Sequence, residues 1–590
     1  MKRSLLIILL IVASIFAPIK QVRSSSATPH NTLFISREPV RARHGMVAST
    51  KQIASQAGLD ILKRGGNAVD AAVATALALA VVHPVAGNLG GGGFMLIRLR
   101  DGRTTAIDYR EVAPSAATRD MYLDAQGNLI KGEGSSTVGY RAAGVPGTVA
   151  GLEMALRKYG SGRFTWSQLV EPARQLAANG FTVSNVMAAS LQREKKLADY
   201  EDTRKIFLNN GKFYKEGDVL RQPELAATLA RLQRFGPKEF YQGTTARLIV
   251  EDMKRHNGLI TLEDLRSYTP KERVPIRGTY RGYEIISMPP PSSGGIILIE
   301  MLNMLEGYDL HSLGWSSSDS LHILIEVMRR AFADRAEYLG DADFVHVPVA
   351  GLTDKAYAAR LRSTINLKHA SKSADVRPGK PAGEESSDTT HFTVIDRDGN
   401  AVANTYTLND DYGSGVVARG TGMLLNDEMD DFTSKVGAPN LYGLIQSARN
   451  QIEPRKRPLS AMTPTFVLRK DGSLWFTVGS PGGPRIITAV LQVILNVIDY
   501  QMNIREGVDA PCIHHQWLPD EIRFEPYGLS ADTVNALTAR GHKLELRPEF
   551  KGYTRRGYMG DVQSIMIEEG TGVLLGASDA RRSEGGPVGY

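Results

Sequence analysis

The chain has 590 residues, of which 42% are hydrophobic and 23% charged, and 70 lysines and arginines against 63 aspartates and glutamates give a formal net charge of +7. This composition excludes a disordered, collagen-like or coiled-coil protein. The basic excess is small and forms no dense run of lysines and arginines, so we expect no nucleic-acid partner. The single cysteine, Cys512, excludes an intrachain disulfide and a cysteine-based metal site.

The first residues have the pattern of a secretory signal. Lys2 and Arg3 form a basic head, an almost purely apolar stretch follows over residues 5–18, and Ser25-Ser26-Ala27 offers the small residues that a signal peptidase reads. The apolar stretch is short for a membrane span, which needs about 20 residues. We therefore expect residues 1–27 to be removed and the mature chain to be periplasmic or secreted, without stable membrane association. An uncleaved anchor is the alternative.

Hydrophobic spacing and stop signals predict the next elements. Residues 46–48 read as a strand, and Ser49-Thr50 are expected to cap a helix over 51–64 that Gly65-Gly66 end. A second helix is expected from residue 67 or 68 to 82, ended by Pro84. Further helices are expected over 148–159, 166–179, 223–235 and 319–337, and a strand over 283–287.

The stretch 371–388 is rich in proline, glycine, serine and charge and has no periodicity, which predicts an exposed, mobile segment. From Thr389 onward the pattern indicates a new unit dominated by strands. No internal repeat of 20–50 residues is visible.

Three Asp-Gly pairs between alternating runs predict hairpins, at residues 101–102, 398–399 and 471–472. A two-residue turn fixes the register of each hairpin and therefore predicts which residues meet at its open end. The expected neighbours are Arg110 with Gly93, Thr389 with Leu408 beside Thr407 and Asn409, and Ser460 with Gly482-Gly483. Each open end thus carries groups that could hold or attack a polar substrate.

Three groups of residues that could suggest a binding site also have simpler interpretations. Gly90-Gly91-Gly92-Gly93 precedes a strand and lacks a P-loop lysine, which favours close backbone approach over phosphate binding. Arg110 could be a solvated residue at a strand end or a bidentate clamp for a carboxylate. His514 and His515, near Asp520, could suggest a metal site, but adjacent side chains on an extended backbone point to opposite faces, and we expect no metal.

Thr389 is the sharpest catalytic candidate. It follows the polar segment at Asp388 and opens a hydrophobic strand. If the bond between Asp388 and Thr389 were cut, Thr389 would carry a hydroxyl nucleophile and a free α-amine. An α-amine has a pKa near 7.7–8.0 in model compounds, so it could serve as the base for its own hydroxyl without a histidine or acidic partner.

In these residues the chain resembles the γ-glutamyltransferases (γ-glutamyltranspeptidases, or glutathione hydrolases), members of the N-terminal-nucleophile hydrolase superfamily. The resemblance extends from the helix start at residues 65–72 to the final Gly-Tyr. The motifs that carry it are Asp108-Tyr109-Arg110-Glu111, Pro289-Pro290-Pro291-Ser292-Ser293-Gly294-Gly295, Asp388-Thr389-Thr390-His391, Arg457-Pro458-Leu459-Ser460, Gly479-Ser480-Pro481-Gly482-Gly483 and His514-His515-Gln516-Trp517-Leu518-Pro519.

The resemblance implies an α+β fold, a four-layer αββα sandwich that two subunits build from one precursor. It implies self-cleavage between Asp388 and Thr389 into a large subunit (28–388) and a small subunit (389–590) that pair as a heterodimer. It also implies cleavage of γ-glutamyl amides such as glutathione through an ester on Thr389, with water, an amino acid or a peptide as acceptor, and no cofactor or metal. The implied roles are a helping hydroxyl on Thr407, an oxyanion hole at Gly482 and Gly483, α-carboxylate binding by Arg110 and Ser460, α-ammonium binding by Asn409, Glu428 and Asp431, and a lid within residues 432–457 that carries Tyr442.

One position departs from the family. Where two serines usually follow each other, this chain has Ser460-Ala461, which keeps the backbone amide and loses one hydroxyl. Two other functions therefore stay open: an acylase of the same fold that accepts cephalosporin, glutaryl or other amides, and an unprocessed secreted binding protein. Arg110, Asn409 and Asp431 argue against the first, and intact Thr389, Thr407 and Gly482-Gly483 argue against the second.

Overall fold

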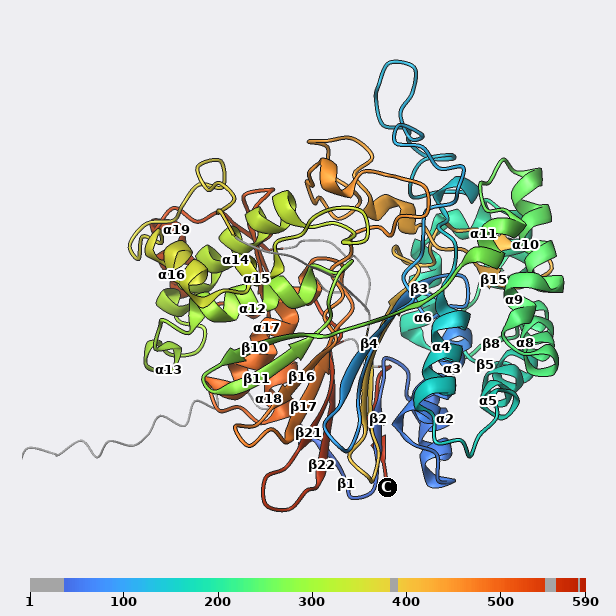
Figure 1. Cartoon of the computed structure of the whole chain (residues 1–590), viewed down its shortest axis with the longest axis horizontal. Helices are drawn as coiled ribbons and strands as arrows, with labels where there is room; N and C mark the ends of the chain where they lie inside the picture. Colours follow the sequence, from blue (N-terminus) through green and yellow to red (C-terminus); the bar gives the residue numbers. More distant parts are fainter. Residues whose placement is uncertain (1–36, 382–390, 547–558, 582–583) are drawn as a thin grey trace, which may run out of the picture. The chain divides into compact units, whose positions relative to one another are not determined.

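The computed structural model describes residues 37–381, 391–546, 559–581 and 584–590, and all of these belong to one compact unit (Figure 1). The unit combines helices with several sheets, which confirms the predicted mixture of α and β structure. Asp388 and Thr389 lie outside the described residues, as does the expected signal segment. None of the described helices is long and apolar enough to cross a membrane.

Two seven-stranded sheets, with antiparallel neighbours throughout, form the centre of the unit. Sheet A has the order β1 (Val40–Ala42), β22 (Leu574–Ser578), β21 (Gln563–Ile567), β17 (Leu474–Gly479), β16 (Thr465–Leu468), β11 (Tyr283–Ser287) and β10 (Ile276–Tyr280). Sheet B has the order β23 (Val588–Gly589), β2 (Met46–Ala48), β12 (Phe392–Ile395), β13 (Ala401–Thr407), β3 (Gly92–Arg98), β4 (Thr104–Asp108) and β9 (Lys271–Arg273).

The hydrophobic core has three main parts. One cluster joins Phe94 and Leu96 of sheet B to Ile286 and Phe466 of sheet A. A second lies between sheet B and the helices α2–α5 and α8, and a third between sheet A and the helices α12, α14 and α17 (Figure 1). Successive side chains of a strand point to opposite faces, and here both faces are buried. This is why strands such as β3 read as continuous apolar runs.

The predicted helices are present with boundaries close to those expected. They are α2 (Gln52–Lys63), α3 (Ala68–Val82), α4 (Thr148–Tyr159), α5 (Trp166–Asn179), α8 (Pro223–Phe235) and α14 (Ser318–Tyr338). The other longer helices are α6 (Asn185–Arg193), α7 (Glu201–Phe207), α10 (Thr244–Arg255), α12 (Gly294–Leu305), α16 (Lys355–Ser363), α17 (Arg485–Ile498) and α19 (Ala531–Ala539). The predicted cap of α2 is wrong, because Lys51 is the N-cap residue and the hydroxyl of Ser49 bonds to the Lys51 carbonyl and to Ser55 instead.

The three hairpins are present, but their registers near the turn differ from the prediction by one residue. Gly102, Gly399 and Gly472 each adopt a positive φ, of 88°, 85° and 82°, and end a three-residue loop. This is the common turn in which a left-handed glycine adds one residue. Gly93 therefore lies opposite Tyr109 and not opposite Arg110. In the third hairpin a bulge after Val467 restores the predicted pairing farther from the turn.

The segment after residue 390 is not a separate unit, contrary to the prediction. Strands β12 and β13 lie between β2 and β3 of sheet B, and the helices α17 and α19 accompany the strands. The sequence signal marked a change of local composition, which does not reveal that the strands pair with partners hundreds of residues away.

In the first part of the segment 371–388, Lys372, Asp375, Arg377 and Lys380 are exposed as predicted, but other groups of the segment are held by tertiary hydrogen bonds. Ser373 is fully buried, its amide donates to Asp520 over 2.8 Å, and its carbonyl accepts from the Trp517 indole over 2.9 Å. The Gly379 amide donates to Asp334 over 2.6 Å. The polar composition predicted an exposed segment, but these tertiary hydrogen bonds hold the segment against α14. Residues 382–388 lie outside the described part.

Candidate active site

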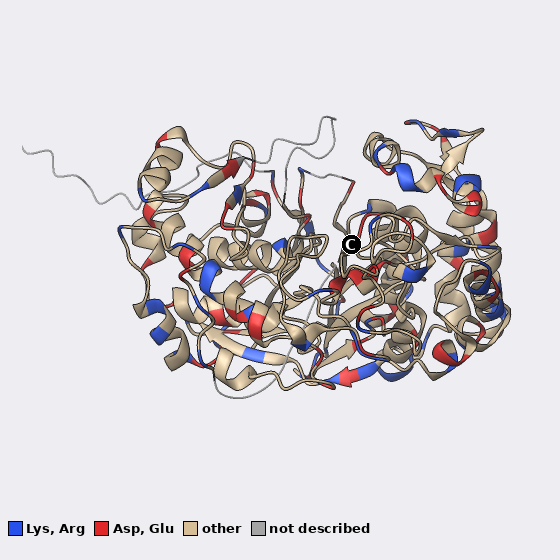
Figure 2. Cartoon of the chain, turned by 90° about the horizontal axis from the view of Figure 1, so that it is seen from above, with Lys and Arg blue, Asp and Glu red and all other residues tan. Residues whose placement is uncertain are grey.

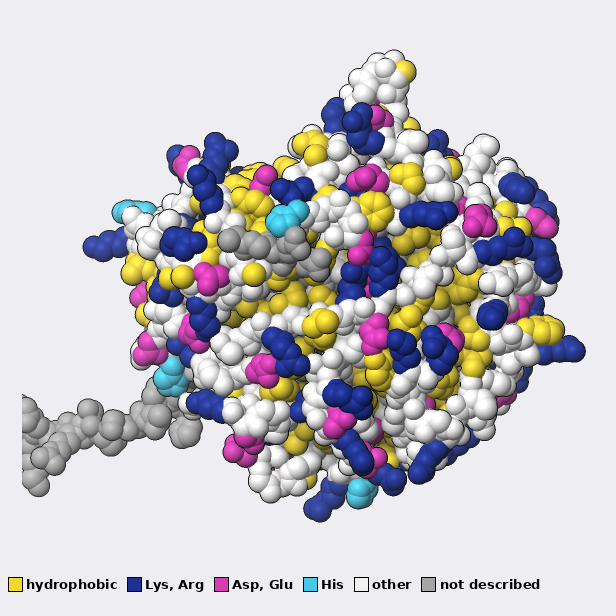
Figure 3. Space-filling view, in the orientation of Figure 1, with side chains coloured by type: hydrophobic (Ala, Val, Ile, Leu, Met, Phe, Trp, Pro, Cys, Tyr) yellow, Lys and Arg dark blue, Asp and Glu magenta, His cyan; other side chains and the backbone are white. Residues whose placement is uncertain are grey.

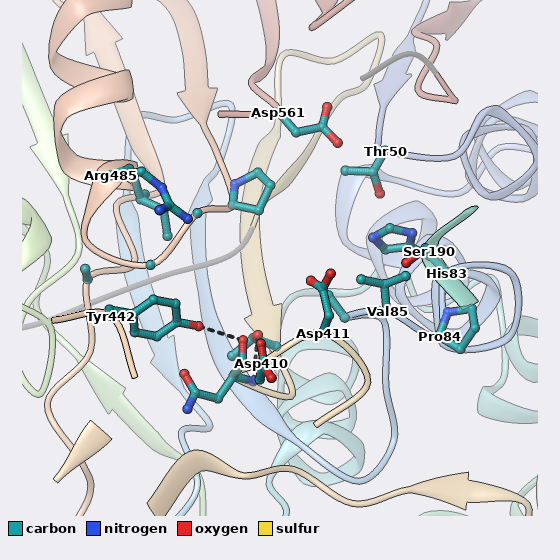
Figure 4. A pocket seen from close by; sticks show the side chains of 18 of the residues that line it. Thr50, His83, Pro84, Val85, Ser190, Asp410, Asp411, Tyr442, Arg485 and Asp561 are labelled. Atoms are coloured by element: carbon teal, nitrogen blue, oxygen red, sulfur yellow. Dashed lines mark hydrogen bonds between the residues drawn. The ribbon is translucent and has the colours of Figure 1, made fainter. Parts of the chain in front are cut away.

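The open ends of the second and third hairpins, at Thr407 and Asn409 and at Ser460 with Gly482-Gly483, meet at one cavity of about 620 Å³ (Figure 4). Tyr442 and Arg485 lie on one side of it, Thr50, His83 and Ser190 on the other. All predicted site residues that the structure describes line this cavity except Arg110, which lies behind its wall: Thr407, Asn409, Glu428, Asp431, Tyr442, Ser460, Ala461, Gly482 and Gly483. The cavity thus brings together residues from distant parts of the chain, from Thr50 to Glu584.

Arg110 follows β4 and is completely buried. Its guanidinium forms ion pairs with Glu428 at 2.5 Å and with Asp431 at 2.6 Å, and its Nε donates to the Pro458 carbonyl over 3.3 Å. A solvated residue at a strand end, the simpler interpretation, is therefore excluded. The two carboxylates that hold Arg110 are themselves part of the cavity wall.

Glu428 and Asp431 belong to the 3₁₀ helix η3 (Glu428–Asp431), and both are buried. Burial raises the pKa of Glu428 well above its ordinary range and raises that of Asp431, while the charge of Arg110 opposes both shifts. Burial also raises the pKa of the neighbouring Glu111 to about 7. The second buried cation near this group is Arg335, whose charge lowers the pKa of Asp431. Burial therefore favours the neutral form of Glu428, and a positive charge added beside it would favour its ionised form.

Thr407 ends β13, and Asn409 follows it with a φ of 82°. Asparagine adopts this left-handed conformation more readily than most residues. The turn lets the Asn409 amide donate to the Thr407 hydroxyl over 2.9 Å, while the Asn409 side chain donates to the Asp427 carbonyl over 3.1 Å. The hydroxyl and the amide side chain are thereby fixed at one wall of the cavity.

Gly482 and Gly483 follow β17 and precede α17, with φ values of 138° and 58°. A Cβ atom on Gly483 would lie 2.7 Å from the ring of Tyr442, so a larger residue does not fit between the turn and the ring. The glycines at 90–93 are explained by close backbone approach, as predicted: a Cβ on Gly91 would lie 2.1 Å from the Thr407 carbonyl.

Tyr442 belongs to a loop over residues 432–457, which we call the lid. Its base is closed by a bridge between Thr433 and Gln451. The Tyr442 hydroxyl donates to the Asn409 carbonyl over 2.8 Å, the contact drawn in Figure 4. The lid therefore reaches across the cavity and joins the turn after β13 to Gly483.

Ser460 and Ala461 form another part of the wall. The Ser460 carbonyl accepts from the amide and hydroxyl of Ser293 over 3.2 and 2.8 Å, and the Ser293 hydroxyl accepts from Arg335 over 2.9 Å. The proline-rich turn before α12 is thus tied to the site. Ala461 is only 5% exposed and presents a methyl group, without a hydroxyl, at this wall.

The relatives of this chain decide its family. The model of the family described as gamma-glutamyltranspeptidase matches residues 54–589. The chain belongs to the γ-glutamyltranspeptidase family. It is 51% identical over 554 residues to the glutathione hydrolase proenzyme of Escherichia coli, covering 94% of this chain and 93% of that one. Its activity class is therefore that of a γ-glutamyltransferase and glutathione hydrolase.

Two solved structures bear on the fold. The cephalosporin acylase from Bacillus halodurans superimposes with a TM-score of 0.82 at 28% identity, over 95% of this chain and 99% of that chain. A γ-glutamyltranspeptidase chain from Helicobacter pylori superimposes with a TM-score of 0.55 at 48% identity, over 58% of this chain and 97% of that chain. The γ-glutamyltranspeptidase fold is thus shared with acylases.

Sequence reasoning missed part of the site of this family member. Arg335, Asp410, Asp411 and Arg485 also line the cavity. Arg335 lies inside the amphipathic helix α14 and gave no signal. The acidic residues within 427–431 could have been used to predict a binding site for a cation. Only the tertiary contacts show which of these residues face Arg110.

Two histidines of the family motifs, His391 and His515, are buried bases of low pKa. Burial lowers the pKa of His391 to about 3 and that of His515 to about 4. His515 contacts Asp520 at 3.3 Å, while His514 contacts Thr488 at 2.9 Å. In the described ranges no group of three or more histidine, cysteine, aspartate or glutamate residues could hold a metal ion.

The buried His391 predicts acid sensitivity. Because its pKa is about 3 in the folded chain and near 6.5 when unfolded, the unfolded state binds the extra proton below about pH 6.5. The free energy of unfolding should therefore fall as the pH drops from about 6.5 toward 3, by about 1.4 kcal/mol per pH unit for this group. His391→Asn should reduce that slope by this amount. Urea unfolding of the wild type and of His391→Asn at pH 7, 6 and 5 measures it, and equal slopes in both proteins would contradict the assignment.

Proposed function

We propose that this γ-glutamyltranspeptidase matures by cutting itself between Asp388 and Thr389 and that Thr389 then carries the reaction. The hydroxyl of Thr389 attacks the carbonyl of the preceding peptide, the C–N bond breaks, and water hydrolyses the resulting ester to free the α-amine. The base is the α-amine and not His391, the histidine of the same motif. A group with a pKa of about 3 is a poor proton acceptor at neutral pH. The word proenzyme in the name of the Escherichia coli relative also fits such processing.

In the proposed reaction, Thr389 attacks the γ-amide carbonyl of a glutamyl donor such as glutathione. The amides of Gly482 and Gly483 stabilise the oxyanion, a contribution worth roughly 3–4 kcal/mol per donor in comparable enzymes, and Thr407 assists the nucleophile. The amine leaves, and water or the amine of an amino acid or peptide resolves the γ-glutamyl ester. The turn geometry that excludes any Cβ at Gly483 supports this role.

The observation that carries the substrate assignment is the buried ion-pair cluster of Arg110 with Glu428 and Asp431. A free α-amino acid head group is a zwitterion, so its two charges can form ion pairs with both the cation and the carboxylates of this cluster. Its α-carboxylate would pair with Arg110 and Ser460, and its α-ammonium with Asn409, Glu428 and Asp431. The carboxyl oxygens of Glu428 and Asp431 in the cavity wall are acceptors for an ammonium and support its binding there.

The proposed mature protein is a heterodimer of residues 28–388 and 389–590 in the periplasm or outside the cell, after removal of residues 1–27. The matched chain from Helicobacter pylori covers only 58% of this chain although 97% of it is matched, which supports a large subunit of similar extent. The three hydrophobic clusters, one between the sheets and one under the helices on either side, support a four-layer αββα sandwich. Sheet B contains strands from both proposed subunits, so both would build it.

A panel of γ-glutamyl amides and amides without the α-amino acid head tests this function most directly. We expect release from the γ-glutamyl compounds alone. A denaturing gel tests the alternative of an unprocessed binding protein, for which a single band near the full size is expected in place of two.

The acylase alternative rests on Ala461 and on the high structural similarity to a cephalosporin acylase. We expect Ala461→Ser to lower KM for γ-glutamyl donors by about tenfold, because a donor to a charged group contributes about 1.5–3 kcal/mol and Arg110 and Ser460 already share this carboxylate. The value of kcat should change little, since the contact is remote from the scissile bond. Kinetics on a γ-glutamyl anilide and a glutaryl anilide measure the effect. A wild type that prefers the glutaryl compound, with no gain from the serine, would replace our assignment by an acylase.

A further inference from the structure

The lid contacts a second surface feature, the loop over residues 119–139, which we call the arm. In Figure 1 the arm rises at the top of the molecule beside the orange lid, and Figure 3 shows it as a projection from the surface. Figure 2 shows basic and acidic residues interspersed over the whole ribbon, so no single-sign charge field distinguishes this region. Specific hydrogen bonds and one hydrophobic cluster join the arm to the lid or to η3 beside it.

Asp430 is the central member of these contacts. The tight turn of η3 directs Glu428 and Asp431 toward Arg110, whereas Asp430 accepts from the Ser136 hydroxyl of the arm over 2.6 Å and from the Leu441 amide of the lid over 2.8 Å. Asp430 is 5% exposed. One buried carboxylate therefore joins the arm to the lid.

At their bases arm and lid also pack together, because Met121 and Tyr122 of the arm join Phe432 and Ile452 of the lid in one hydrophobic cluster. Farther out the two loops are less densely packed. A cavity of about 240 Å³ lies between arm and lid, lined by residues of both loops, among them Lys131, Ser136 and Asn440. Across this region Lys435 of the lid donates to the Gly127 carbonyl of the arm over 2.7 Å. Polar contacts at Asp430 and Lys435 thus hold the lid beside a gap in which it has room to move.

The contact at Leu441 acts on the active site through the next residue. Tyr442 follows Leu441 directly, places its ring against Gly483 and donates to the Asn409 carbonyl. The segment is also held by Asn440, which donates to Asp431 over 3.3 Å, and by Gln516, which donates to the Tyr442 carbonyl over 3.2 Å. If the Leu441 amide loses its acceptor, the segment that positions Tyr442 therefore loses one of its fixed points. Both Gly483 and Asn409 belong to the wall that faces the substrate.

We propose that Ser136 and Asp430 are positioning residues that hold the lid closed and thereby set the affinity for the γ-glutamyl donor. The proposal rests on the function proposed above for the cavity. Ser136 keeps the Asp430 carboxylate oriented toward the Leu441 amide. The hydrogen bond from that amide to Asp430 then fixes the backbone next to Tyr442. We call the contacts of Asp430 with Ser136 and with the Leu441 amide the latch. Opening of the lid should raise KM more than it lowers kcat, because Thr389, Thr407 and the glycine amides are not part of the latch.

The variant Ser136→Ala removes the donor and leaves Asp430 intact. We expect KM for a γ-glutamyl anilide to rise about threefold to tenfold, with kcat within about twofold, since a hydrogen bond to a charged group accounts for about tenfold or more in an equilibrium constant. Trypsin cleavage after Lys435, detected as a new N-terminus at Val436, should become several-fold faster. Ser136→Thr keeps the hydroxyl and should behave like the wild type.

Ser135→Ala is the matched control. Its hydroxyl lies on the same arm and contacts Thr137 at 3.2 Å and not Asp430, so both readouts should stay at wild-type values. Asp430→Asn, which can offer only one of the two acceptors, should open the lid at least as far as Ser136→Ala. Cleavage rates and KM for Ser136→Ala and Asp430→Asn equal to those of Ser135→Ala would overturn the latch. Trypsin cleavage needs no turnover, so it tests the latch even if the anilide is not a substrate and the proposed function fails.

Discussion

Thr389→Ala should remain one polypeptide and show no activity. In the proposed mechanism, self-cleavage needs a hydroxyl at residue 389 to attack the preceding carbonyl, and the later reaction needs the same hydroxyl as nucleophile. Alanine removes both steps at once, so the loss should be complete. A denaturing gel should show one band in place of two, and the release of amine from a γ-glutamyl anilide should fall to the uncatalysed level.

Thr390→Ala supplies the matched control for this experiment. It removes the neighbouring hydroxyl of the same threonine pair and leaves Thr389 intact, so this variant should still yield two bands. Two subunits in Thr389→Ala, with a new terminus at residue 389, would show that the cut does not depend on this hydroxyl. The nucleophile would then have to be sought among the other groups of the cavity.

Arg110→Lys should raise KM for γ-glutamyl donors by about tenfold to a hundredfold while self-cleavage proceeds normally. A lysine keeps the positive charge but loses the planar fork that binds carboxylates at two points. It also leaves Glu428 and Asp431, which Arg110 now contacts through two different nitrogens, with one compact ammonium between them. Steady-state kinetics and a denaturing gel on the same preparation measure both effects.

Arg273→Lys is the control for Arg110→Lys, because Arg273 pairs with Asp108 at 2.8 Å and Asp343 at 2.7 Å without lining the cavity. We expect its KM to stay at the wild-type value. An unchanged KM in Arg110→Lys would mean that this buried arginine only stabilises Glu428 and Asp431, and another cation would have to bind the substrate carboxylate.

The sequence alone was sufficient for the local elements. Helices such as α4 (Thr148–Tyr159) and α5 (Trp166–Asn179) were predicted at their observed boundaries, because their apolar spacing and stop residues are local signals. The hairpins were also local, although the turn type shifted the register by one residue, since Asp-Gly permits both a two-residue turn and a three-residue turn with a left-handed glycine. The order of the motifs along the chain was enough to indicate the family.

The tertiary structure alone decided which groups share a wall and what charge each one meets. That Arg110 is buried against Glu428 and Asp431, more than 300 residues away in the chain, follows from the pairing of β13 with β3 and from the turn of η3, neither of which leaves a local signal. The same holds for Ser373, whose polar surroundings in sequence predicted exposure but whose tertiary hydrogen bonds bury it. Local sequence records the preferences of a short segment, whereas burial and pKa depend on the partners that the whole fold brings to it.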